Sequence, residues 1–127
     1  MEQEFYYCEI CQNLVIMLHD SGIPLNCCGE DMQRLAPSTD GAPEKHQPIH
    51  EEKDGRVTVN VASVEHPMSD SHYIQWVALK TNHGIQIKHL TPTDKPTVCF
   101  ALAEGERVEH VYSYCNLHGL WHSNILA

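Results

Sequence analysis

Four of the six cysteines in this chain lie within its first 28 residues, and this crowding limits what the segment can fold into. A segment shorter than about 40 residues buries too little apolar surface to fold alone, so it needs disulfides or a metal. Cys8 and Cys11 form a Cys-x2-Cys pair, whose tight turn aims both thiolates at one point, and Cys27 and Cys28 supply a second pair. Four thiolates bind zinc or a single iron ion. We therefore expect folding and metal binding to be one event here.

Two alternatives to an iron site remain open for these cysteines. Six cysteines in a short chain can form a disulfide framework, although ligand-like spacings in a reducing cytosol favour free thiols. A plain zinc ribbon accounts for the four thiolates as well as iron does, since both ions accept that ligand set. Because Cys27 and Cys28 are adjacent, we expect a distorted site on their side, with Gly29 free to adopt a positive φ.

Composition divides the chain into three parts. The apolar run 14–18 and the turn signal 20–24 predict a short β-hairpin with cysteines at both ends. Residues 37–43 are small and polar with a proline at each end, which is typical of a linker. We expect a metal-binding hairpin domain at 1–36, the linker at 37–43 and a larger domain at 44–127.

The larger domain shows a hydrophobic period of two, which is typical of strands. Val57, Val59 and Val61 alternate with polar or small residues, and similar runs follow. Asp54-Gly55 and Glu104-Gly105 are predicted hairpin turns, and Cys99, within an apolar alternating run, is expected to be a small buried residue. About seven short strands predict an all-β chain that ends in an immunoglobulin-like antiparallel β-sandwich. The strands with the clearest patterns span 57–61, 73–79, 85–90, 97–103 and 108–115.

A second group of metal-ligating residues lies in the larger domain, where each member falls at a predicted strand end or loop. Residues distant in sequence can meet at one rim of a sandwich in this way. Iron held by several imidazoles and one thiolate, with a coordination position left over, can bind a small oxidant and pass it an electron. This group therefore indicates a redox enzyme. Its members are His46, His66, His72, Cys115 and His118; the other histidines are expected to be ordinary surface or hydrogen-bonded residues.

The charge of the chain excludes several partners. Eight Lys and Arg residues against 17 Asp and Glu give a net charge of -9, which opposes binding to nucleic acid or to an anionic membrane surface. No segment approaches the roughly 18 consecutive apolar residues that cross a bilayer, and the N-terminus has no apolar signal region. We expect a soluble cytoplasmic protein.

Taken in order and spacing, these motifs resemble desulfoferrodoxin, the two-iron form of superoxide reductase. The resemblance covers nearly the whole chain. It is carried by Cys8-x2-Cys11, Cys27-Cys28-Gly29, Glu44-Lys45-His46, His66-Pro67-Met68, His72-Tyr73-Ile74-x-Trp76 and Cys115-Asn116-x-His118-Gly119-Leu120-Trp121.

The resemblance implies two mononuclear non-haem iron sites. The four cysteines would hold a rubredoxin-like iron, for which zinc is a possible substitute. The second iron would have four equatorial imidazoles, an axial Cys115 thiolate and an open sixth position where superoxide is reduced to hydrogen peroxide, which protects against oxidative stress. Lys45 would attract the anion, and Glu44 matches a carboxylate that occupies the sixth position of the resting ferric iron. A rubredoxin donor and a homodimer are also implied. The equatorial ligands would be His46, His66, His72 and His118.

Three other functions make different predictions. A superoxide dismutase would return half of the superoxide as oxygen. An electron-transfer or metal-sensing protein, with the second iron never open, would form no adduct with azide or cyanide. A zinc-stapled interaction module would leave His66, His72 and Cys115 without a joint purpose.

Overall fold

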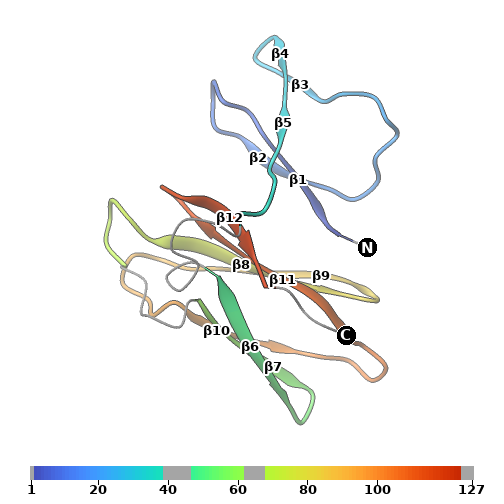
Figure 1. The fold of residues 1–127 in the computed structure, drawn as a ribbon, viewed down its shortest axis with the longest axis vertical. Coiled ribbons are helices and arrows are strands. Elements are labelled where there is room, and N and C mark those ends of the chain that lie inside the picture. The colour runs from blue at the N-terminus through green and yellow to red at the C-terminus, as the bar shows by residue number, and fades with distance from the viewer. Residues whose placement is uncertain (1, 39–46, 62–67, 124–127) are drawn as a thin grey trace. The chain divides into compact units, whose positions relative to one another are not determined.

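The computed structural model describes residues 2–38, 47–61 and 68–123. The chain divides into two compact units, Met1–Ala36 and Pro37–Ala127. Within the described ranges every regular element is a β-strand (Figure 1), and there is no helix long and apolar enough to cross a membrane. The expected all-β fold is confirmed.

The first unit is built on a small antiparallel sheet. Its strand order is β2-β1-β5, formed by β1 (Glu4–Tyr7), β2 (Leu14–Met17) and β5 (Gln33–Arg34). A separate two-stranded ladder joins β3 (Asn26–Cys27) to β4 (Glu30–Asp31). Among residues 2–36, Phe5 and Cys8 alone are buried. The apolar core of this unit is therefore very small.

The hairpin of the first unit differs from the predicted one. β1 pairs with β2, and the turn between them carries Cys8 and Cys11. The chain reverses there because the Gln12 N–H donates to the Cys8 carbonyl over 2.8 Å and the Cys8 N–H donates to the Asn13 carbonyl over 2.9 Å. The signal at 20–24 marks a local turn instead, in which the Gly22 N–H donates to Asp20 Oδ1 over 2.8 Å, on the connection from β2 to β3.

The second unit is a sandwich of two antiparallel sheets, as predicted. One sheet has the order β10-β7-β6 and the other β12-β11-β8-β9, and Figure 1 shows them as separate layers. In the seven-strand arrangement of immunoglobulin-like domains, the two sheets enclose one core. The strands are β6 (Pro48–Lys53), β7 (Arg56–Val61), β8 (Ile74–Thr81), β9 (Gly84–His89), β10 (Thr97–Ala101), β11 (Val108–Cys115) and β12 (Gly119–His122).

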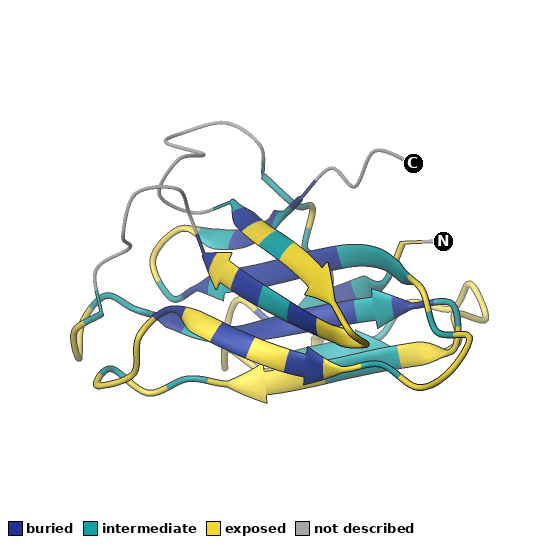
Figure 2. Ribbon diagram, turned by 90° about the horizontal axis from the view of Figure 1, so that it is seen from below, coloured by how far each residue is buried: buried dark blue, intermediate teal, exposed yellow. Residues whose placement is uncertain are grey.

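The core follows the period-two pattern of the sequence. Buried and exposed residues alternate along strands of the sandwich, visible as dark blue and yellow bands in Figure 2. Cys99 is exposed, so the prediction that it is buried was wrong. Its neighbours Val98 and Phe100 take the core face of β10, which turns Cys99 outward. The core comprises Val57, Val59, Val61, Ile74, Val77, Leu79, Val98, Phe100, Val111 and Cys115.

Of the two predicted hairpin turns, one is confirmed and one was wrong. Asp54 and Gly55 have φ values of 53° and 76° and join β6 to β7, as a two-residue hairpin turn requires. Gly105 also has a positive φ, 81°, but β10 pairs with β7 and β11 pairs with β8. The turn at Glu104-Gly105 therefore carries the chain from one sheet to the other and closes no hairpin.

Candidate metal centres

Two tight turns bring the four cysteines of the first unit together. The Sγ atoms of Cys8, Cys11, Cys27 and Cys28 all lie within 4.8 Å of one another. Cys11 Sγ and Cys27 Sγ are 3.5 Å apart. All six cysteines are free thiols, so the structure contains no disulfide framework. Four converging sulfur atoms fit a single tetrahedral metal ion.

The turn that carries Cys27 and Cys28 has an unusual backbone. Cys27 pairs with Glu30, so Cys28 and Gly29 form a two-residue hairpin turn. Gly29 has a φ of 79°, as expected, and Cys28 also has a positive φ, 55°. This conformation is costly for a residue with a side chain. The two-residue turn requires this conformation, as it does at Asp54, and the turn sets Cys28 beside the other three thiols.

The thiols of this cluster oppose one another's ionisation. Backbone N–H groups of Cys11 and Ile10 lower the pKa of Cys8 to about 7. The neighbouring thiols of Cys11 and Cys8 raise the pKa of Cys27, and they raise that of Cys28 to about 12. Four thiolates therefore cannot coexist near neutral pH unless a cation compensates their charge, which is what a bound metal does.

The second cluster lies on the sandwich, at the end of the β8–β11 strand pair. Cys115 is the last residue of β11, His118 lies in the turn to β12, and His72 lies just before β8. Their ligand atoms are within 4.8 Å of one another. Cys115 Sγ lies 3.6 Å from His118 Nδ1. The ring centroids of His72 and His118 are 4.9 Å apart, with an interplanar angle of 70°.

Burial within this cluster is graded. Cys115 is completely buried, His72 is half-buried and His118 is exposed, so the cluster opens to solvent on the His118 side. Burial raises the pKa of the Cys115 thiol, although N–H groups of Leu117 and His118 act in the opposite direction. Burial and the nearby His118 lower the pKa of His72. His72 is therefore neutral near pH 7, which is the form that binds a metal.

The structure brings together three of the five residues predicted for the second site. His46 and His66 lie outside the described residues, as do Glu44 and Lys45. Two imidazoles and one thiolate fit a transition metal such as iron, and they leave room for further ligands.

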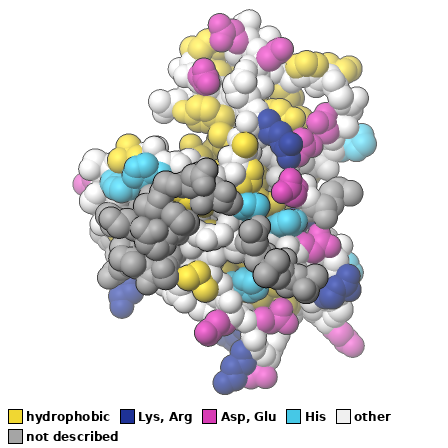
Figure 3. Space-filling view, in the orientation of Figure 1, with side chains coloured by type: hydrophobic (Ala, Val, Ile, Leu, Met, Phe, Trp, Pro, Cys, Tyr) yellow, Lys and Arg dark blue, Asp and Glu magenta, His cyan; other side chains and the backbone are white. Residues whose placement is uncertain are grey.

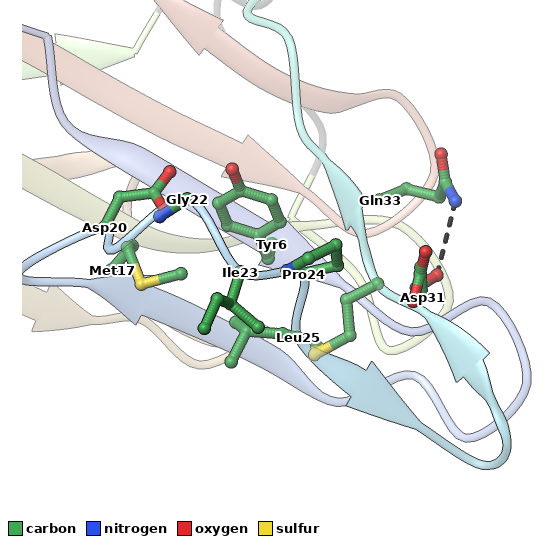
Figure 4. A pocket seen from close by; sticks show the side chains of 10 residues that line it. Tyr6, Met17, Asp20, Gly22, Ile23, Pro24, Leu25, Asp31 and Gln33 are labelled. Atoms are coloured by element: carbon green, nitrogen blue, oxygen red, sulfur yellow. Dashed lines mark hydrogen bonds between the residues drawn. The ribbon is translucent and has the colours of Figure 1, made fainter.

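A cavity of about 340 Å³ in the first unit is separate from the cysteine cluster. Tyr6 and Met17 line it from β1 and β2, and Ile23 and Pro24 line it from the connection to β3 (Figure 4). None of its lining residues is a predicted metal ligand. On the face that Figure 3 shows, Asp and Glu side chains are spread out and form no single patch. Neither feature competes with the two clusters as a candidate reaction site.

Comparison with protein families gives a match in each of the two units. A family model described as "Desulfoferrodoxin, N-terminal domain" matches residues 1–35, and one described as "Desulfoferrodoxin" matches residues 38–124. The chain belongs to the desulfoferrodoxin family. The two matches meet near the boundary between the two compact units.

Individual relatives agree with this membership. The chain is 46% identical to a desulfoferrodoxin from Syntrophotalea carbinolica over 121 residues, which cover 94% of each protein. It is similar to the crystal structure of the superoxide reductase from Treponema pallidum, with 38% identity, a TM-score of 0.81 and coverage of 96% and 97%. A superoxide reductase from Pyrococcus horikoshii is 30% identical over 69% of this chain and 91% of its own length.

Proposed function

We propose that this desulfoferrodoxin family member is a superoxide reductase. One superoxide anion, one electron from a reduced donor and two protons give one molecule of hydrogen peroxide, and no oxygen is made. The observation that carries the proposal is the cluster of Cys115, His72 and His118 on the sandwich, in which His118 is exposed. Relatives named superoxide reductase support the reaction.

Two mononuclear non-haem iron ions complete the proposal. Cys8, Cys11, Cys27 and Cys28 hold the first, a site that also accepts zinc. His72, His118 and Cys115 hold the second together with His46 and His66. Ferrous iron bound by these residues would supply the electron that reduces a small anion.

The residues around the second site then have distinct tasks. Cys115 supplies a thiolate from the buried side of the cluster. His72 supplies a neutral ring, since its pKa is lowered. His118 stands at the exposed side, where the anion and the two protons arrive from solvent.

Lys45 and Glu44 are proposed to act on the substrate. The protein carries a net charge of -9, so a local cation is needed to attract an anion. Lys45 would have this role, and the carboxylate of Glu44 would act as a ligand to the second metal when no substrate is present. Lys45→Ala should slow superoxide capture measured by pulse radiolysis while leaving the iron spectrum largely unchanged. Equal capture rates in the variant and the parent would contradict the role.

The donor and the setting also belong to the proposal. Rubredoxin is the electron donor, the protein is a homodimer, and it acts in the cytoplasm in defence against oxidative stress. The four-cysteine iron would be a relay or dispensable, because the second site has ligands enough to hold an iron that could reduce the anion without it. If Cys11→Ser abolishes steady-state reduction while the second site keeps its iron, this part is wrong.

The decisive experiment measures iron and zinc per chain on anaerobically purified protein, with visible spectra before and after oxidation. We expect two irons and a thiolate-to-iron charge-transfer band that develops on oxidation and is lost in Cys115→Ser. One zinc and no iron under iron-replete expression would refute the proposal. Product stoichiometry completes the test, since a dismutase returns half of its superoxide as oxygen.

A further inference from the structure

Asn116 connects the two chain segments that carry the second cluster. Its Oδ1 accepts a hydrogen bond from the Tyr73 N–H over 2.9 Å, and its Nδ2 donates to the Ser71 carbonyl over 3.0 Å. Its backbone N–H donates to the Tyr73 carbonyl over 3.2 Å. These bonds hold both neighbours of His72. Asn116 itself directly follows Cys115, so one residue ties the His72 segment to the thiol.

The same arrangement recurs at the other end of the same strand pair. Asn82 directly follows β8, as Asn116 directly follows β11. Asn82 Oδ1 accepts from the Arg107 N–H over 2.6 Å, and its Nδ2 donates to the Gly105 carbonyl over 3.1 Å. Its N–H donates to the Arg107 carbonyl over 3.1 Å. Each asparagine therefore binds the segment that precedes the partner strand, and the two ends match bond for bond.

The match extends to the side chains that each asparagine brings together. At the Asn82 end, Thr81 takes the place of Cys115 and Glu106 takes the place of His72. Thr81 Oγ1 donates to Glu106 Oε2 over 2.7 Å. The His83 N–H donates to Thr81 Oγ1 over 3.2 Å, as N–H groups of the β11–β12 turn do to the Cys115 sulfur. At both ends of the strand pair, the hydrogen bonds of the asparagine thus bring together one side chain from each of the two segments, although the chemistry of these side chains differs.

We propose that Asn116 is a positioning residue, which holds His72 in place to share a metal ion with Cys115 and His118. This inference rests on the metal site of the proposed function. Partners that orient metal ligands typically change metal affinity by about 10- to 100-fold when they are removed. Loss of the Asn116 side chain frees the His72 segment from two of its bonds to the turn after β11.

The chain offers a matched pair of variants, Asn116→Ala and Asn82→Ala. Each removes the same two side-chain hydrogen bonds from the same strand pair, so both should lower the melting temperature by similar amounts. Fe(II) is titrated anaerobically against a competing chelator, and occupancy of the second site is read after oxidation from the band that Cys115→Ser removes. We expect Asn116→Ala to weaken binding by about 10- to 100-fold and to shift the band, and Asn82→Ala to do neither.

Equal Fe(II) affinity and an unshifted band in Asn116→Ala would overturn the assignment, as would equal losses in both variants. If Asn116→Ala does not fold, the isosteric pair Asn116→Asp and Asn82→Asp replaces it. Asp keeps the acceptor for the backbone N–H and loses the donor, so the band should shift in Asn116→Asp only, and an unshifted band overturns the proposal. Neither readout needs superoxide. A parent protein that binds iron but reduces no superoxide would refute the function and leave this inference standing.

Discussion

The two clusters differ in what holds their ligands. The four cysteines lie in a unit whose described residues bury only Phe5 and Cys8, and one of their two turns places Cys28 in a left-handed conformation. His72, Cys115 and His118 lie on a sandwich with a core drawn from four strands, and hydrogen bonds hold their backbone. In the first unit the metal must stabilise the fold, whereas in the second the fold prepares the site for the metal.

Metal removal should give the largest difference between the two units. Structural metal sites of this kind contribute about 10–16 kcal/mol of apparent binding free energy at pH 7. Chelation should therefore unfold residues 1–36 and leave the sandwich folded. Hydrogen exchange measured by peptide would show lost protection in the first unit only. The denaturant-induced unfolding transition of the two tryptophans, Trp76 and Trp121, should persist after chelation because both lie in the second unit.

A matched cysteine pair controls this experiment. Cys11→Ser removes a ligand, while Cys99→Ser changes another exposed cysteine that belongs to neither cluster. Cys99→Ser should change stability by less than about 0.5 kcal/mol. If the metal-free first unit keeps its amide protection, the contrast between the two units is wrong.

A substitution in the core of the sandwich should destabilise the second unit and leave the first unit unchanged. Phe100 is completely buried in the sandwich, and Phe→Ala substitutions in cores cost about 3–5 kcal/mol. Phe100→Ala should lower the denaturant midpoint of the tryptophan transition and leave exchange protection of the metal-loaded first unit unchanged. Equal destabilisation of both units would mean that they fold together.

The metal affinity of the two clusters should also respond differently to pH, although this effect is smaller than the effects on folding. The pKa values of Cys27 and Cys28 are raised, so both thiols must lose a proton when the metal binds. Affinity should rise with pH, by about 100-fold per pH unit from these two thiols between pH 7.5 and 8.5.

At the second cluster the Cys115 pKa is raised, while the lowered pKa of His72 leaves its ring neutral in this range. Metal binding then releases one proton, from Cys115, so the metal affinity of this cluster should rise about tenfold per pH unit. Zn(II) competition titrations of Cys115→Ser and Cys11→Ser measure each site separately. Equal slopes would contradict the contrast.

Sequence patterns predicted the sandwich better than its connections. Alternation located the strands because one buried face imposes a period of two, but it could not decide which face of the 97–101 run is buried, and Cys99 was assigned to the wrong one. Glu104-Gly105 marked a turn correctly. A turn signal is local, however, and which strands pair depends on packing across the whole unit.

At the second cluster, too, the sequence predicted the ligand residues but not the contacts that hold them. Ligand types and spacings singled out Cys115, His118 and His72, and the structure brings them together. Asn116 was part of a motif but had no predicted role, because its partners lie 43 and 45 residues away and only the folded strand pair places them beside it. The matching Asn82 lies in a turn that the sequence indicates, but it had no predicted partner, because Gly105 and Arg107 lie 23 and 25 residues away.

The backbone of Cys28 has a consequence for how quickly the first metal exchanges. A residue with a side chain costs about 1–2 kcal/mol in this left-handed conformation, which the two-residue turn between β3 and β4 requires and which sets the Cys28 thiol at the tip of the hairpin. Cys28 is also exposed, so water and competing ligands reach its sulfur directly. Cys11 is exposed as well and Cys8 is buried, so we expect metal exchange with the surrounding solution to begin on the side of the cluster that carries Cys11 and Cys28.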